Sequence, residues 1–178
     1  MSISIYKPNS KNTGCAFSFR YGVQQKNQEP CLFINAIQQY NWNEESKTGS
    51  FSQNRNNPEK NITLKFNEFE CGSILSSLTN RYEYNTFHTY GENKTTIKLS
   101  PWDKEIKVSH LNKNSKKFEQ KTQVLPAFGI SITRNGSDTF KIPIEPGEIE
   151  VVKELLSKII EKILIHRISI QIKSQNND

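Results

Sequence analysis

Cysteine is rare in this chain, with only Cys15, Cys31 and Cys71 among its 178 residues. Their number is odd, and they form neither a Cys-x-x-Cys pair nor a Cys/His spacing of the kind that holds zinc. These features argue against a disulfide framework and against a zinc finger. We therefore expect three buried free thiols in a reducing intracellular compartment: the cytoplasm, the nucleus or nucleoid, an organelle matrix or a virus-infected cell.

Long apolar runs are also missing, and none reaches the roughly 20 residues that a membrane helix needs. Residues 1–8 lack the apolar core and the small-residue cleavage site of a secretory signal. The three histidines (His88, His110 and His166) lie far apart, and no glycine-rich loop joins an expected strand to a helix. We therefore expect a protein that is not an enzyme, is not in a membrane, and has no metal and no cofactor.

The chain has an excess of positive charge, and most of this excess lies in one segment. The formal net charge is +6, and residues 94–121 contain eight lysines against three acidic residues. A local basic field attracts polyanions, because nucleic acids release counterions when their phosphates are neutralised. From charge alone two interpretations stay open: a nucleic-acid contact, or a solvated lysine-rich loop without a partner.

The order of the expected elements indicates the fold class. Two runs of strand-like segments each end in a helix, the first near residues 67–78 and the second near residues 146–164. Strands that are grouped in runs pair in antiparallel sheets, whereas strands that alternate with helices form parallel ones. The sequence therefore predicts an α+β fold with antiparallel sheets.

Local signals predict several boundaries. Asn67 and Glu70 have the spacing of a capping box at the start of the first helix. Asn135-Gly136 predicts a tight hairpin, because both central residues of a type I′ turn need positive φ. Pro143 predicts an edge strand, because proline donates no hydrogen bond to a sheet.

Two segments have weaker patterns. Residues 103–122 are rich in lysine, and we expect a weak strand near residues 106–108 followed by a mobile loop. After the second helix, Ile168, Ile170 and Ile172 alternate with polar residues, which is typical of a strand. We expect residues 174–178 to be disordered.

Aromatic residues suggest where a nucleic acid would bind. One face of the strand expected at residues 82–90 carries Tyr82, Tyr84, His88 and Tyr90. Tyr40 and Trp42 lie close together in an Asn-rich run. Aromatic rings on a sheet stack on unpaired bases of any sequence, at roughly 1–3 kcal/mol per base.

Nearby cations complete this expected platform. Arg20, Lys94 and Lys98 are placed to follow the phosphates of a bound strand. The alternative is that the aromatic residues face the core, since tyrosine is common in half-buried strands. In that case we expect the platform to be built from Arg20, Tyr21, Phe33 and Tyr40.

Five segments, taken in order, resemble one family. They are residues 4–7 with residues 14–19, Tyr40-Asn41-Trp42-Asn43, residues 69–75 (Phe-Glu-Cys-Gly-Ser-Ile-Leu), Asn85-Thr86-Phe87-His88, and residues 138–144. The chain resembles the Whirly-type single-stranded DNA-binding proteins, within the wider group that includes the positive-cofactor transcription coactivators. The resemblance covers residues 4–164, and the lysine-rich segment and the C-terminal tail are additions to it.

The resemblance implies more than the residues do. It implies two roughly four-stranded antiparallel sheets, each run closed by a helix, in a Whirly-like domain over residues 1–166. The lysine-rich segment is then an insertion, and residues 167–178 a partly disordered tail. It also implies helices that form the core of a homo-oligomer, with a tetramer favoured. The broad apolar stripe of the second helix independently supports assembly.

The function that the resemblance implies is binding of single-stranded DNA with low sequence specificity. The process would be DNA replication, repair, recombination or transcription regulation. The expected nucleic-acid-binding residues also include Lys7, in the segment that resembles the family's entry strand, and Lys11, in the segment that resembles its basic stretch. Two alternatives stay open: binding of single-stranded or guide RNA, and a protein-interaction or regulatory module on the same fold.

Overall fold

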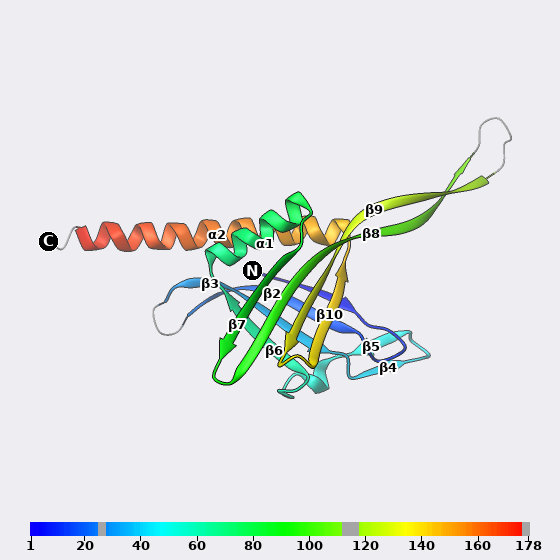
Figure 1. The fold of residues 1–178 in the computed structure, drawn as a ribbon, viewed down its shortest axis with the longest axis horizontal. Helices are drawn as coiled ribbons and strands as arrows, with labels where there is room; N and C mark the ends of the chain where they lie inside the picture. Colours follow the sequence, from blue (N-terminus) through cyan, green and yellow to red (C-terminus); the bar gives the residue numbers. More distant parts are fainter. Residues whose placement is uncertain (25–27, 112–117, 176–178) are drawn as a thin grey trace.

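The computed structural model describes residues 1–24, 28–111 and 118–175. Its first sheet has the order β1-β2-β3-β6, and its second has the order β10-β9-β8-β7. All pairings are antiparallel, and a short hairpin of β4 and β5 forms a third, two-stranded sheet. Each four-stranded sheet is followed along the chain by a helix. The expected α+β fold with two antiparallel four-stranded sheets is confirmed (Figure 1).

The elements have the following bounds. The first run comprises β1 (Ser2–Lys7), β2 (Cys15–Val23), β3 (Pro30–Gln38), β4 (Asn41–Asn43), β5 (Thr48–Ser50), the 3₁₀ turn η1 (Ser52–Asn54), β6 (Asn61–Phe66) and α1 (Glu68–Asn80). The second run comprises β7 (Tyr84–Tyr90), β8 (Asn93–Leu111), β9 (Phe118–Arg134), β10 (Asp138–Ile144) and α2 (Pro146–Gln175).

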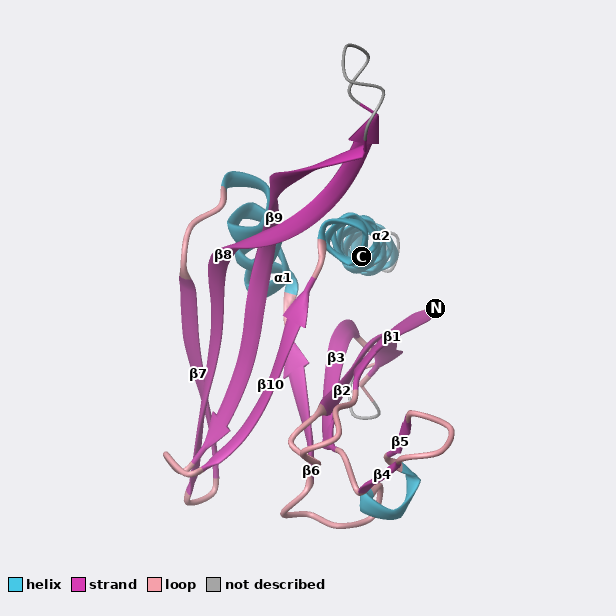
Figure 2. Cartoon of the chain, turned by 90° about the vertical axis from the view of Figure 1, so that its right-hand side faces the viewer, coloured by secondary structure: helices cyan, strands magenta, loops and turns pink. Residues whose placement is uncertain are grey.

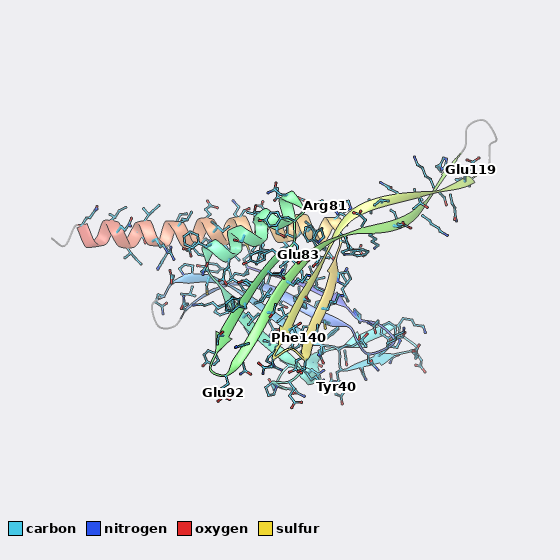
Figure 3. The ribbon with its side chains drawn as sticks, viewed as in Figure 1. Tyr40, Arg81, Glu83, Glu92, Glu119 and Phe140 are labelled. Carbon is cyan, nitrogen blue, oxygen red and sulfur yellow. The ribbon has the colours of Figure 1, made fainter. Side chains whose placement is uncertain are left out.

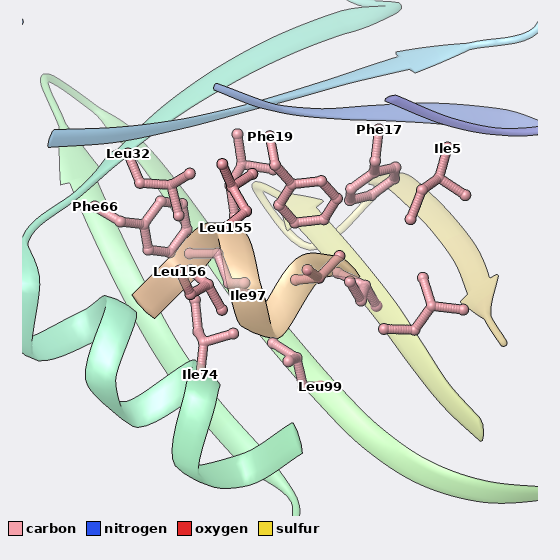
Figure 4. Close-up of a cluster of buried hydrophobic side chains, with 14 of the residues drawn as sticks. Ile5, Phe17, Phe19, Leu32, Phe66, Ile74, Ile97, Leu99, Leu155 and Leu156 are labelled. Carbon is pink, nitrogen blue, oxygen red and sulfur yellow. The ribbon is translucent and has the colours of Figure 1, made fainter. Parts of the chain in front are cut away.

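One hydrophobic core joins both sheets and both helices. Figure 2 shows the helices together at one end of the two sheets. Alternate residues of each strand point inward, so Phe19 and Phe66 of the first sheet meet Ile97 of the second (Figure 4). Leu155 of α2 and Ile74 of α1 close the same cluster. Each sheet therefore keeps one outer face that no helix covers (Figure 2).

The local sequence signals are confirmed. The Asn67 side chain accepts from the Glu70 amide at 3.0 Å, and the Glu70 carboxylate accepts from the Asn67 amide at 2.9 Å. Both central residues of the Asn135-Gly136 turn have positive φ, 51° and 74°. Pro143 lies on β10, which is an edge strand of the second sheet.

The lysine-rich segment corrects one expectation. The pairing of β8 with β9 continues from Asp103↔Pro126 to Leu111↔Phe118, so residues 103–111 and 118–126 form a two-stranded arm that projects from the body (Figure 1). Glu119 lies toward its tip (Figure 3). The mobile loop expected after residue 108 is therefore wrong for the described residues, and its central part, residues 112–117, lies outside them. A complete backbone ladder holds the arm, although many of its side chains face solvent.

The C-terminal segment corrects a second expectation. Helix α2 continues to Gln175, so the prediction of a strand around Ile168 is wrong. Residues 174 and 175 are also helical. Residues 176–178 lie outside the described part of the chain. Helix α2 runs through residues 166 and 167, and the domain boundary expected there stays a prediction. Arg167 pairs with Glu29 at 2.9 Å and with Glu68, which ties this part of the helix to the body.

The three cysteines are buried and free, which explains a property of their thiols. Burial raises the pKa of Cys15 and Cys31, and raises that of Cys71 from 9.0 to about 12, with a smaller contribution from the Glu70 carboxylate. A thiol with a raised pKa stays protonated in the folded state and reacts slowly as a nucleophile.

The raised Cys71 pKa predicts a loss of stability in alkali. Above pH 9 the thiol of the unfolded chain ionises, whereas the buried thiol of the folded protein stays protonated. The contribution of this thiol to folding stability is therefore complete below pH 9 and is lost as the pH rises toward 12. One such thiol would cost roughly 1.4 kcal/mol by pH 10. Urea unfolding at pH 8 and pH 10 should show a smaller alkaline loss for Cys71→Ala than for the wild type. Equal losses in both proteins would contradict the prediction.

Candidate nucleic-acid interface

The outer face of the first sheet is polar and basic, and its two rows around Phe33 contain no carboxylate. Strand register places Ser2, Arg20, Phe33 and Lys65 in one row across β1, β2, β3 and β6. The next row consists of Ser4, Ser18, Asn35 and Thr63. With two cations and no acidic side chain in either row, this face attracts anions.

A stacked cation and aromatic ring lie at the centre of this face. The Arg20 guanidinium lies over the Phe33 ring, 4.9 Å from the ring centroid. Gly22 makes room for the ring, because a Cβ at Gly22 would lie 2.5 Å from Phe33 Cε2. Within the described residues, Arg20 forms no ion pair. Phenylalanine rings and guanidinium planes both stack on unpaired bases.

Hydrogen-bonding groups lie beside this pair. The Asn35 amide donates to Asn61 Oδ1 at 2.6 Å and to Thr63 Oγ1 at 2.9 Å. The Ser4 and Ser18 hydroxyls are 2.7 Å apart. A shallow hollow of about 330 Å³ is lined by Ser2, Ser4, Ser18, Arg20, Phe33, Asn35 and Thr63. The hollow combines a stacking surface with donors and acceptors that can reach the edges of a base.

The structure places Tyr84 and His88 on the core side of β7. His88 Nε2 lies 2.6 Å from Glu70 Oε1, and its ring lies 5.0 Å from the Phe66 ring. Tyr84 packs against the core, and burial raises the pKa of its hydroxyl. The opposite side of the strand carries Phe87, which is 76% exposed. Phe87 is therefore the aromatic ring on the outer side of β7.

The other two aromatic residues of this segment lie at its ends. Tyr82 precedes β7 and is 42% exposed, and its carbonyl accepts from Ser77 Oγ. Tyr90 ends β7 and is 88% exposed. The four residues expected to share one stacking face are therefore divided between the core and the two ends of the strand.

The remaining expected aromatic residues lie apart from Phe33. Tyr21 packs on the core, with Lys162 Nζ 5.6 Å from its ring centroid. Tyr40 is half-exposed at the start of the β4–β5 hairpin, and Trp42 is partly buried within it. The structure therefore brings together only Arg20 and Phe33 of the alternative platform.

The expected lysines differ in whether they form ion pairs. Lys7 pairs with Glu148 at 2.7 Å at the start of α2, and Lys98 pairs with Glu83 at 2.7 Å. The hydrogen bond from Lys98 lowers the pKa of the Glu83 carboxyl. Lys11, in the β1–β2 loop, and Lys94, at the start of β8, are exposed. Neither forms an ion pair with a described residue.

Two solved structures share this architecture. The plant transcriptional regulator PBF-2 superposes with a TM-score of 0.54 and 13% sequence identity, over 96% of this chain and 86% of that chain. WHY1 from Arabidopsis thaliana superposes with a TM-score of 0.56 and 14% identity, over 100% of this chain and 93% of that chain. The chain has a Whirly-type fold. At these identities the likeness concerns the fold alone.

Comparisons of the sequence itself find no further relative. No protein-family model matches the sequence, and no curated protein matches it. Within residues 1–24, 28–111 and 118–175, no helix is long and apolar enough to cross a membrane. The same residues contain no group of three His, Cys, Asp or Glu side chains that could hold a metal ion.

Several residues on the outer faces of this Whirly-type fold were not among the expected binding residues. Lys65 and Asn35 belong to the rows around Phe33, and Phe87 and Lys141 lie on the outer face of the second sheet. Phe87 could have been found as the alternate residue of the strand that carries Tyr84. Lys65 and Lys141 are isolated lysines in sequence. Strand register places Lys65 beside Phe33, and Lys141 lines the same surface hollow as Trp102.

Proposed function

We propose that this protein binds single-stranded DNA with low sequence specificity on the outer faces of its sheets. The observation that carries the proposal is the Arg20–Phe33 pair, which lies among hydrogen-bonding side chains in two rows of the sheet that contain no carboxylate. The solved structure of PBF-2, a plant transcriptional regulator, adds support through its similar fold. The processes we propose are DNA replication, repair, recombination or transcription regulation, in a reducing intracellular compartment.

The geometry favours an unpaired strand over a duplex. Stacking on Phe33 needs the flat face of a base, which a duplex hides within its own stack. Within its four-stranded sheet, the Phe33 surface lies on strands rather than on a helix that could enter a major groove. Arg20 and Lys65 on either side of Phe33 suit a backbone that crosses the sheet along this row.

Fluorescence anisotropy with labelled oligo-dT and a duplex of equal length tests the proposal. We expect clear binding of oligo-dT, weak binding of the duplex, and an affinity that falls by orders of magnitude from low to moderate salt. Competition by oligo-U and by oligo-dU separates RNA from DNA binding, because these two strands differ only in the 2′-hydroxyl. Absence of oligo-dT binding at low salt would contradict the proposal and leave the protein-interaction module as the alternative.

We also propose that the protein is a homo-oligomer, with a tetramer favoured, whose helices form the assembly core. Beyond Ile163, α2 carries five aliphatic side chains that are 48–58% exposed: Leu164, Ile165, Ile168, Ile170 and Ile172. A helical segment rich in β-branched residues is marginal in water unless another surface packs on it. A second copy of α2 would bury these side chains.

Charged substitutions on this segment should dissociate the oligomer. Light scattering at micromolar concentration should give a mass several times 20.6 kDa for the wild type and a lower mass for Ile165→Lys with Ile168→Lys. Ser169→Lys with Gln175→Lys adds the same charge at exposed polar positions and should leave the mass unchanged. A monomeric wild type would remove the assembly proposal.

A further inference from the structure

A second hollow lies on the outer face of the other sheet, where the arm begins. It has a volume of about 630 Å³ and lies between β8, β9 and β10. Its lining residues are Lys98, Ser100, Pro101, Trp102, Gly129, Ser131, Lys141, Ile142 and Pro143. The size falls within the roughly 300–1,000 Å³ of small-ligand sites. None of the residues expected or proposed above to stack on a base contributes to it.

Trp102 forms an aromatic wall that is held in place from outside the hollow. Its side chain is 40% exposed, so it can be approached from solvent. Arg81, at the end of α1, donates to the Trp102 carbonyl at 3.3 Å and to Asp103 Oδ1 at 2.8 Å. Figure 3 places Arg81 beside the root of the arm. The backbone at Trp102 is therefore fixed, and the nearby Asp103 carboxylate is already paired.

Gly129 leaves the floor of the hollow open. It lies opposite Ser100 on β8 and opposite Pro143 on β10. A Cβ at this position would meet only the Ser100 carbonyl oxygen, at 3.9 Å. The fold therefore does not require glycine here for close packing, and the missing side chain lets a flat ring approach the strand.

The charge of the lining defines the kind of ligand. Lys98 and Lys141 are its two charged residues, and no lining residue is acidic. Lys98 is shared with Glu83, whereas Lys141 forms no ion pair within the described residues. An aromatic wall, an open floor and flanking cations together suit a ligand with a flat ring and an attached anion. A nucleotide is such a ligand.

We infer that this hollow receives a base of the bound single strand, which stacks on Trp102 while Lys141 contacts an adjacent phosphate. The inference rests on the proposed function and extends it to a second binding point, on the sheet opposite Arg20 and Phe33. A strand held at both points covers both sheets of one protomer.

Tryptophan fluorescence tests the inference directly. The chain has two tryptophans, so a Trp42→Phe variant leaves Trp102 as the reporter. Oligo-dT should quench this fluorescence on titration, and an abasic oligonucleotide of the same length should not. Phe33→Ala in the same background should weaken binding but leave the quench at saturation unchanged, because Trp102 still receives its base.

Two substitutions test whether the hollow contributes to affinity. Trp102→Ala should weaken oligo-dT binding roughly 5- to 150-fold, the loss of one base stack. Gly129→Leu, made in the Trp42→Phe background, should have an effect in the same direction and remove the Trp102 quench, because its side chain fills the hollow. Gly147→Leu is the matched control, since a Cβ there meets nothing within 4 Å and lies outside the hollow. Circular dichroism and thermal melting confirm that each variant is folded.

The outcomes separate this inference from the proposed function. If the wild type binds oligo-dT while Trp102→Ala and Gly129→Leu bind equally well, the hollow is not a base site and the proposed function stands. Equal quenching by the abasic oligonucleotide would also overturn the inference. If the wild type binds no single-stranded DNA, both are wrong.

Discussion

Replacing Phe66 with alanine should lower the free energy of unfolding by about 3–5 kcal/mol. Phe66 is fully buried where the end of β6, the start of α1 and the inner side of β7 meet. Its ring lies 5.0 Å from the His88 ring, so its loss leaves a cavity that the capped helix on one side and the sheet on the other cannot close. Since domains are stable by roughly 5–15 kcal/mol, this single change removes a large share. Urea unfolding followed by circular dichroism measures it.

Phe87→Ala is the matched control for Phe66→Ala. Phe87 lies on the outer side of β7 and is 76% exposed, so we expect a change within about 0.5 kcal/mol. A large loss at Phe87 together with a small loss at Phe66 would mean that β7 is turned the other way. Tyr84 and His88 would then be available as the stacking platform expected from the sequence.

The orientation of β7 shows what sequence alone could not decide. Its alternation was visible, but both sides of the strand carry an aromatic residue, so hydrophobicity did not choose between them. The choice depends on distant partners: His88 lies against Phe66 and Glu70, which belong to β6 and α1. Only the three-dimensional packing brings these three residues together.

Elements with local causes were predicted well. The Asn67–Glu70 capping box needs only residues three apart, and the Asn135-Gly136 turn needs only its own two residues. In each case the sequence signal and the stabilising contact lie within a few residues of each other.

The predictions for the arm and for the end of α2 were wrong for a common reason. Many residues on both sides of the arm face solvent, so alternation of apolar and polar residues gives little signal there. The strands of the arm form because β8 pairs with β9, as Asp103 does with Pro126. In α2, Ile168, Ile170 and Ile172 alternate as they would in a strand, but the preceding helix continues through them. Isolated pattern windows miss both effects, because each depends on a structure that begins elsewhere.

Replacing Phe33 with alanine should weaken oligo-dT binding by about 1–3 kcal/mol, the range of one base–aromatic stack. The ring is partly exposed on the outer face of the first sheet, so stability should change far less than for Phe66→Ala. Arg20→Gln should instead reduce the salt dependence of binding by about one unit, because one phosphate contact is lost. Anisotropy titrations at several salt concentrations separate the two effects.

Gly22→Ala tests whether the position of the Phe33 ring matters, without removing the ring. A Cβ at Gly22 would lie 2.5 Å from Phe33 Cε2, so the ring must move from its place under the Arg20 guanidinium. We expect weaker binding with both side chains present. Gly72→Ala is the control, because its Cβ meets nothing within 4 Å. If Phe33→Ala and Gly22→Ala both bind oligo-dT like the wild type, per folded molecule, the stacking surface lies elsewhere on the protein.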